Sequence, residues 1–342
     1  MRKQLMSPSD NDVLLVTGAT GLVGSHVVES ARKAGWIVRA LVRRSTDGEF
    51  LRDLGVELRS GDLESPESLQ AALVGVTHIV HCAAKVGDWG PYSEYERVNV
   101  QGLRSLWDAA WSSQSLRRFV LISSLGVYPA RDHYGTDELE PLSETGIDSY
   151  TRSKIAAEGL LKELAARDRV PFVILRPGFI YGPRDRTVVP RVVDRLRSGQ
   201  FAYLGSGENL LNNTAARNLA TAVLLALETP NTGEAYNITD GRLVSKREFI
   251  ETICRGIDVP FPQKRIPLWF ARMLASGLER VWRLLGREAP PPLSQATIKF
   301  LGFNTDYSIE KARQFLGFDP QLDFSEAMQE TLDVSYPRDV PM

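Results

Sequence analysis

Tyr150 and Lys154 stand four residues apart at the start of a predicted helix, residues 149–167. Side chains at this spacing share one face of a helix. A free phenol has a pKa of about 10 and is a poor base at neutral pH, but a nearby ammonium favours the phenolate and lowers that pKa. The pair is therefore a candidate for acid–base catalysis on a substrate oxygen.

Ser124 follows a predicted strand, residues 119–123. It would therefore lie at the carboxyl end of a parallel sheet, where ligands bind in open α/β folds. Its hydroxyl can donate to a substrate oxygen. A tyrosine and a lysine at helical spacing are common on ordinary helices, so the pair gains specificity only from Ser124 and from a glycine-rich turn near the N-terminus.

That turn contains Gly18, Gly21 and Gly24 and lies between an apolar run, residues 13–16, and a helical stretch, residues 25–31. Strand, turn and helix form the context of a dinucleotide-binding fingerprint. The first glycine permits the tight turn, the second lets the backbone approach a pyrophosphate, and the third lets the helix pack closely. The anion would meet free N–H groups at the helix N-terminus. The spacing is three and three rather than the commoner two and three, and a purely structural turn is the alternative.

The residues after the second predicted strand, residues 36–42, indicate which dinucleotide binds. An NAD site usually offers an acidic residue there to the ribose 2′-OH. Arg43 occupies that position, followed by Arg44. A guanidinium binds a 2′-phosphate that a carboxylate would repel, so we expect NADP(H), with NAD(H) as the alternative if both arginines are merely solvated. Asp62 and Leu63 end the third strand and are expected to border the adenine.

Strands and helices alternate through the first half of the chain, with further strands expected at residues 56–59, 78–82 and 172–175. This alternation predicts an α/β fold, a Rossmann-type doubly wound parallel sheet. We assign residues 11–180 to a dinucleotide-binding domain and residues 181–342 to a smaller substrate-binding region. Segments near 210–240 are expected to return to the first domain, and the chain from about residue 258 is expected to be irregular.

The composition excludes several classes of function. The 342 residues carry a net charge of −1, which gives no support to nucleic-acid binding. Two cysteines fit a reducing cytosol, and the first twelve residues lack the apolar core of a signal peptide. We therefore expect a cytoplasmic protein. The four histidines form no metal-ligand constellation, so no metal is expected.

Residues 267–286 form an amphipathic stretch. An apolar face and an arginine-rich face alternate at helical spacing, and the apolar face consists of Phe270, Leu274, Leu278, Val281, Trp282 and Leu285. A packed helix of the substrate-binding region is the ordinary interpretation. A lid, or a peripheral contact with a membrane surface, is the alternative.

From residue 13 to about residue 324 the chain resembles the extended short-chain dehydrogenase/reductase family. The matching segments are residues 17–24, 61–63, 81–84, 99–102, 123–124, 150–154 and 176–183. The resemblance implies that Tyr150 is the acid and base, that Lys154 activates it and holds a ribose hydroxyl, and that Ser124 polarises the carbonyl or carbinol. The cofactor-binding residues would be Gly18, Thr20, Gly21, Leu22, Val23, Arg43, Asp62, Leu63, Ala83, Ala84, Lys85, Tyr150, Lys154, Pro177 and Ile180.

Within that family the chain is most similar to the 3β-hydroxysteroid dehydrogenase branch, which includes bacterial reductases of 2-alkyl-3-oxoalkanoic acids. Residues 84–92, 189–191, 290–293 and 307–313 carry this similarity. It implies an oxidoreductase that interconverts a secondary alcohol and a ketone on a small hydrophobic substrate, a 3β-hydroxysteroid, a sterol 4-carboxylate or a long-chain 2-alkyl-3-oxo acid. A homodimer is usual in the family and is expected here. An apolar wall for the substrate could come from Trp89, Tyr92, Phe179 and Tyr181, each of which could equally belong to the core.

Two other functions stay open. Nucleotide-sugar epimerases and reductases of the family often carry an arginine near residues 210–213 that grips the diphosphate, and here that stretch has no cation, although Arg217 is nearby. The second alternative is a catalytically silent NADP-binding sensor. The presence of Tyr150, Lys154 and Ser124 together argues against it.

Overall fold

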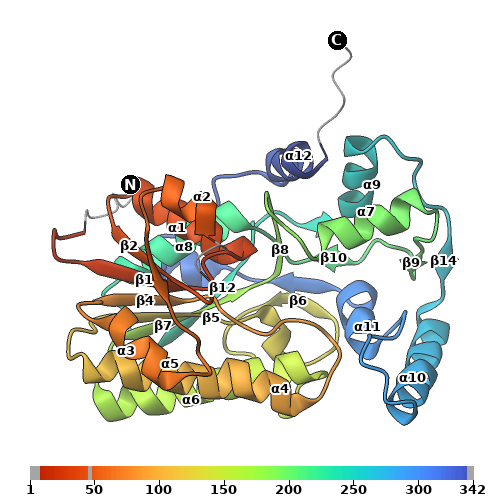
Figure 1. Ribbon diagram of the computed structural model, residues 1–342. Coiled ribbons are helices and arrows are strands. Elements are labelled where there is room, and N and C mark those ends of the chain that lie inside the picture. Colours follow the sequence, from red (N-terminus) through yellow and green to blue (C-terminus); the bar gives the residue numbers. More distant parts are fainter. Residues whose placement is uncertain (1–7, 45–47, 337–342) are drawn as a thin grey trace.

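A parallel sheet of seven strands forms the centre of the protein, in the order β12-β7-β5-β4-β1-β2-β3 (Figure 1). The computed structural model describes residues 8–44 and 48–336. The strand order reverses between β1 and β4, the point at which such sheets bind ligands. The predicted Rossmann-type fold is therefore confirmed. The strands are β1 (Val13–Thr17), β2 (Ile37–Val42), β3 (Glu57–Ser60), β4 (His78–His81), β5 (Arg118–Ile122), β7 (Phe172–Pro177) and β12 (Glu234–Ile238).

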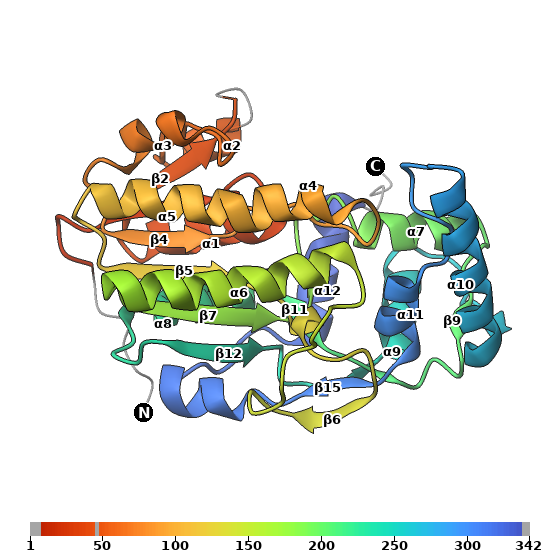
Figure 2. The same cartoon turned by 90° about the horizontal axis from the view of Figure 1, so that it is seen from below.

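Helices cover both faces of this sheet because its central strands are apolar on both sides. Successive side chains of β5 alternate, so that Val120 and Ile122 enter one core cluster and Phe119 and Leu121 the other. The first cluster lies under α1 (Leu22–Lys33) and α8 (Ala216–Glu228), and the second under α3 (Pro66–Leu73), α5 (Gly102–Ser112) and α6 (Ser149–Asp168). Figure 2 views the molecule from the α5 and α6 side.

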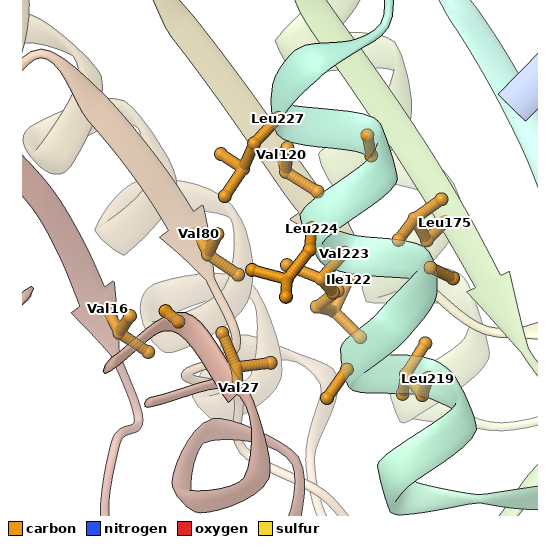
Figure 3. Packing of buried hydrophobic residues seen from close by; sticks show 14 of the residues in the cluster. Val16, Val27, Val80, Val120, Ile122, Leu175, Leu219, Val223, Leu224 and Leu227 are labelled. Carbon is orange, nitrogen blue, oxygen red and sulfur yellow. The ribbon is translucent and has the colours of Figure 1, made fainter. Parts of the chain in front are cut away.

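The packing of α8 shows that the later part of the chain returns to the first domain. Leu219, Val223 and Leu227 lie at intervals of four residues and face Val120 and neighbouring strand residues (Figure 3). Strand β12 pairs with β7 at the edge of the same sheet. A third returning segment was not expected: Ile309, Ala312, Leu316 and Phe318 join the same core cluster through η4 (Ala312–Leu316), a π-helical turn.

The remaining elements form a smaller body beyond the carboxyl ends of the strands (Figure 1). Its core contains Tyr181, Val193, Phe249 and Phe324. The elements there and at its border are β6 (His133–Thr136), β8 (Phe179–Tyr181), α7 (Val189–Arg197), β9 (Tyr203–Leu204), β10 (Leu210–Leu211), β11 (Asn213–Ala215), β13 (Val244–Ser245), α9 (Lys246–Gly256), β14 (Arg265–Ile266), α10 (Leu268–Leu284), α11 (Gln295–Gly302), β15 (Thr305–Tyr307) and α12 (Phe324–Ser335).

The expectation of an irregular chain after residue 258 is wrong, because α10, α11, β15 and α12 all lie there. The last two helices are short, but each has a side-chain cap. Ser294 accepts from the Thr297 N–H at the start of α11, and Asp323 accepts from the Ser325 N–H at the start of α12. Such caps satisfy N–H groups that a helix start leaves free, so a short helix can begin directly after a proline-rich run.

No helix within residues 8–44 and 48–336 has the length and apolar character needed to cross a membrane.

Candidate active site

The start of α6 fixes the positions of Tyr150 and Lys154. Asp148 caps this helix by accepting a hydrogen bond from the Thr151 N–H at 2.7 Å, and the Thr151 hydroxyl bonds back to the Asp148 N–H, which completes a capping box. Tyr150 and Lys154 then share one face, with the Lys154 ammonium 5.8 Å from the centre of the Tyr150 ring. The Lys154 Nζ donates to the carbonyl of Ile122 at 2.8 Å, so the pair lies at the carboxyl end of β5.

Ser124 lies at the same end of the sheet, directly after β5. Its Oγ accepts from the N–H of Gly126 at 3.0 Å, and this bond starts the short 3₁₀ turn η3 (Leu125–Val127). Its hydroxyl lies near enough to the phenol of Tyr150 to lower the pKa of that phenol. The phenol, the ammonium and the alcohol that the sequence singled out therefore meet at one place.

The protonation of Tyr150 differs from the sequence expectation. Burial raises its pKa to about 12, the Asp148 carboxylate adds to that rise, and the nearby Ser124 hydroxyl opposes it. The Lys154 ammonium does not produce the expected lowering, since it is turned to the Ile122 carbonyl. Burial also lowers the pKa of Lys154 to about 8. At neutral pH Tyr150 is thus a neutral phenol, which is a proton donor.

Asn99 connects this helix to the loop after β4. It lies in η2 (Arg97–Gln101), a π-helical turn between α4 (Tyr92–Glu96) and α5. Its side-chain oxygen accepts from the Lys85 N–H at 2.7 Å, and its amide donates to the Lys85 carbonyl at 3.0 Å and to the Ser153 hydroxyl at 2.8 Å. Ala83, Ala84 and Lys85 are therefore held beside α6. The ammonium of Lys85 is paired with Glu94 at 2.7 Å.

The glycine-rich turn has the close approaches that the fingerprint requires. A Cβ on Gly24 would lie 2.2 Å from the Gly18 carbonyl oxygen, and one on Gly18 would lie 2.8 Å from the Ala83 nitrogen. Gly18 has a φ of +65°, a conformation that favours glycine. Gly21 precedes α1 and gives it no side-chain cap. The N–H groups of Leu22 and Val23, beside Thr20, thus begin a helix that fits a pyrophosphate.

The residues expected around the adenosine lie along the edge formed by β2 and β3. Arg43 follows β2 and is exposed, and within the described part of the chain its guanidinium has no hydrogen bond or ion pair. The Asp62 carboxylate accepts from the Glu64 N–H at 3.0 Å, while Leu63 is buried. Pro177 and Ile180 flank Gly178, where a Cβ would meet the Asn212 carbonyl oxygen at 1.8 Å. The chain is therefore closely packed at the expected nicotinamide end.

Of the four aromatic residues expected to line the substrate, one belongs to the core and the other three are partly buried. Tyr181 is fully buried and donates to Asp240 at 2.9 Å, so its ring belongs to the core. Phe179 packs on the rings of Phe249 and Phe300, whose centres lie 5.2 and 4.7 Å away. Tyr92 lies 3.8 Å under the guanidinium of Arg152, and the indole of Trp89 donates to the Arg287 carbonyl at 3.0 Å.

Sequence reasoning missed Lys299, a partly buried lysine of α11. Its Nζ donates to the carbonyls of Gly126 at 2.6 Å and of Tyr128 at 2.9 Å, so it holds the turn that follows Ser124. No motif marks this residue, and only the spatial proximity of α11 to η3 reveals it. Burial lowers its pKa to about 8.

The lowered pKa of Lys154 predicts a loss of rate at alkaline pH. We expect kcat to fall as pH rises through about 8, because the buried ammonium becomes a neutral amine. A loss of stability caused by this lysine does not explain the decline. Between the folded pKa of about 8 and the ordinary value of 10.5, the unfolded chain binds more protons than the folded protein. The ionisation of this lysine therefore raises the free energy of unfolding as pH rises through this range.

The measurement is kcat at saturating cofactor across this pH range. Lys154→Met should be slower and should lack the alkaline decline. Lys299→Met is the matched control, since Lys299 also has a pKa of about 8 and should leave the decline in place. An unaltered decline in Lys154→Met would contradict the assignment.

A doubly wound sheet, a glycine turn and a tyrosine–lysine pair beside a serine together define a dinucleotide-dependent enzyme. A model of the family described as "NAD dependent epimerase/dehydratase family" matches residues 14–239. The chain belongs to this family, whose members are extended short-chain dehydrogenases/reductases.

Several relatives match almost the whole chain. A 2-alkyl-3-oxoalkanoate reductase of Stenotrophomonas maltophilia is 33% identical over 326 residues, which cover 92% of this chain and 97% of that protein. The mouse sterol-4-alpha-carboxylate 3-dehydrogenase, decarboxylating, is 28% identical over 93% of this chain and 89% of that protein. The crystal structure of gox2253 is 30% identical and superimposes with a TM-score of 0.79 over 94% of this chain and 97% of that chain.

These similarities confirm the resemblance and the enzyme class expected from the sequence: an NAD-dependent dehydrogenase or reductase. A structure that holds a nucleotide sugar and NAD is also among the similar ones. MoeE5 in complex with UDP-glucuronic acid and NAD is 26% identical, with a TM-score of 0.73 over 95% of this chain and 98% of that chain.

Proposed function

We propose that the protein is an NADP(H)-dependent ketoreductase that acts on a hydrophobic 3-oxo acid of the 2-alkyl-3-oxoalkanoate type. The observation that carries the proposal is the placement of Tyr150, Lys154 and Ser124 together at the carboxyl end of β5. A phenol placed there can give a proton to a ketone oxygen during reduction, or take one from an alcohol in the reverse reaction. The names of relatives such as the Stenotrophomonas reductase support this substrate class.

The residues divide the reaction between them. Reduced nicotinamide supplies a hydride when it is bound. Ser124 and Tyr150 bind the substrate oxygen between their hydroxyls. Tyr150 gives its proton to that oxygen as negative charge develops there. The Lys154 ammonium holds a ribose hydroxyl of the cofactor, the role that the family resemblance implies. The Gly126 N–H occupies one acceptor site of the Ser124 oxygen, which directs the hydroxyl proton of Ser124 away from this turn.

The alternative of a nucleotide-sugar epimerase has less support. The stretch from 210 to 213 carries no cation, and the nearby Arg217 is paired with Glu330 of α12 at 3.0 Å. A diphosphate at this place would have to compete with that carboxylate.

The test is a substrate panel in which NADPH absorbance follows net oxidation or reduction, and chromatography of the sugar products follows epimerisation, which consumes no net cofactor. It contains long-chain 2-alkyl-3-oxo acids, sterol 4-carboxylates, 3β-hydroxysteroids with NADP⁺, and UDP-sugars. We expect NADPH consumption with the oxo acids. Turnover of UDP-sugars alone would replace the proposal with the epimerase, and binding of NADPH without turnover of any compound would replace it with the sensor.

Arg43→Asp tests the cofactor. Charge-assisted bonds to a 2′-phosphate contribute about 1.5–3 kcal/mol, so the preference for NADPH over NADH in kcat/KM should fall about 10- to 100-fold. Arg44→Asp is the neighbouring control and should change the ratio less, since Arg43 occupies the position of the usual acid. Equal use of NADH by the wild type, unaffected by Arg43→Asp, would contradict NADP(H) preference.

A further inference from the structure

Helix α10 exposes most of its large apolar side chains and buries two small ones, while Leu268, Leu278 and Trp282 are partly buried. Only Ala271 and Ala275 of this helix are buried. Polar bonds to α11 add to this contact, with the Gln295 N–H donating to Glu279 at 2.7 Å and its amide to Ser276 at 2.8 Å. The ordinary interpretation of the sequence was that the apolar face of this helix packs against the protein. In the structure the small side chains of Ala271 and Ala275 make that contact, and most of the larger apolar side chains point outward.

We call the outward residues the α10 face. They lie on one side of the helix at spacings of about 3.6 residues per turn. Trp269 is 69% exposed and Leu284 is 87% exposed. The α10 face consists of Trp269, Phe270, Met273, Leu274, Val281, Leu284 and the following residue, Leu285. Seven exposed large apolar side chains on one element form a patch of the kind that marks an interaction site.

The same segment is strongly basic. Residues 264–287 contain six arginines and lysines and one acidic residue, Glu279, whereas the whole chain has a net charge of −1. Glu279 is engaged within the hairpin, by Gln295 and by Arg283 at 3.2 Å. Arg280 is exposed and has no ion-pair partner in the described part of the chain. The basic charge is therefore not neutralised locally.

The α10 face lies at the outer end of the molecule, and Figures 1 and 2 both place α10 beyond α11. The chain after α10 contacts the loop that follows β4. The Trp89 indole donates to the Arg287 carbonyl at 3.0 Å, and the Ser294 hydroxyl donates to the Asp88 carboxylate at 2.7 Å. The same loop is held against α6 by Asn99, so the α10 hairpin is connected to the candidate active site.

We propose that the α10 face docks on the surface of an anionic lipid bilayer. Apolar side chains would enter the interface, while the arginines contact lipid headgroups. A second copy of this chain fits the face less well. A symmetric dimer would bring two copies of the same basic segment together, and like charges at an interface oppose association.

The proposal extends the proposed function, since a long-chain oxo acid partitions into bilayers and would reach the site from there. Its test does not depend on activity. The full-length protein is mixed with vesicles of phosphatidylcholine alone or with added phosphatidylglycerol, and the protein that floats with the vesicles is measured. We expect flotation only with the anionic vesicles, and less of it as the salt concentration rises.

Two sets of variants locate the contact. Trp269→Ser combined with Leu284→Ser should weaken binding at least about tenfold, since each removes exposed apolar area of several CH₂ groups. Arg280→Gln should weaken it about fivefold, because a basic residue near an anionic surface contributes about 1 kcal/mol. The matched controls are Leu139→Ser and Arg169→Gln. Leu139 is 89% exposed outside α10, and Arg169 ends α6 on the side opposite Tyr150.

Both controls should bind as the wild type does. The proposal fails if the protein does not float with anionic vesicles, or if the controls weaken binding as much as the α10 variants do. Sedimentation velocity provides the remaining test: self-association that is lost in the Trp269→Ser/Leu284→Ser variant, without vesicle binding by the wild type, would make the face a contact between copies. NADPH turnover of soluble substrates should be unchanged in the α10 variants, so failure here leaves the proposed function intact.

Discussion

Replacing Tyr150 by phenylalanine is expected to lower kcat for ketone reduction by about 10²- to 10⁴-fold, the usual contribution of a positioned acid or base. The substitution removes only the hydroxyl that meets Ser124. The ring and the capped start of α6 stay, so folding should be retained. The measurement is the steady-state rate of NADPH oxidation with the best oxo acid of the substrate panel.

Two further variants make the result specific. Ser124→Ala should lower kcat less, because Tyr150 still supplies the proton. Tyr134→Phe is the matched control, since Tyr134 is 75% exposed in β6 and its hydroxyl faces solvent. Binding of NADPH, followed by fluorescence, should be unchanged in Tyr150→Phe. A rate equal to the wild type in this variant would show that another group transfers the proton.

The sequence was sufficient to predict the sheet and the proximity of Tyr150 and Lys154 at the carboxyl end of β5. Alternating apolar strands and helices permit few topologies, because parallel strands need right-handed crossovers. Ser124 was found because it follows a strand, and Tyr150 and Lys154 because helical spacing places them together. These are local features of the chain, so they could be read without coordinates.

The direction of the Tyr150 pKa could not be predicted in this way. The sequence shows that Lys154 is near, but not that its ammonium is turned to the Ile122 carbonyl or how deeply the phenol is buried. The same holds for Lys299, which reaches η3 across 173 residues of sequence. The outward orientation of the apolar side chains of α10 also depends on which side of the helix its neighbours cover. Burial and long-range contact decide all three, and neither has a local signature.

The second large effect concerns a buried ion pair one helical turn along α6 from Lys154. Glu158 lies one helical turn after Lys154 and is completely buried. Arg176 of β7 donates to its two oxygens at 3.0 and 2.7 Å, and the Ser123 hydroxyl donates at 2.6 Å. Arg176 also donates to the Tyr128 hydroxyl at 2.8 Å. The pair thus connects α6, β7 and the segment around Ser124.

Glu158→Leu should lower the free energy of unfolding by about 3–5 kcal/mol, because it leaves the Arg176 charge buried without a counter-charge. Guanidinium denaturation of the wild type and the variant measures this loss. The double variant Glu158→Leu/Arg176→Met should be clearly more stable than the single variant, since replacing a whole buried pair by apolar residues is often neutral. If the loss in the free energy of unfolding of the double variant equals the sum of the losses of the two single variants, the two side chains do not act as a pair.

The double variant also separates stability from catalysis. The Glu158 carboxylate raises the pKa of Lys154 against the larger lowering by burial. Without that carboxylate the ammonium should lose its proton more easily, so the alkaline decline of kcat should move to lower pH even where stability is recovered. A stable double variant with an unshifted decline would limit the pair to holding α6 on β7. A shifted decline would show that the pair also keeps Lys154 charged at neutral pH.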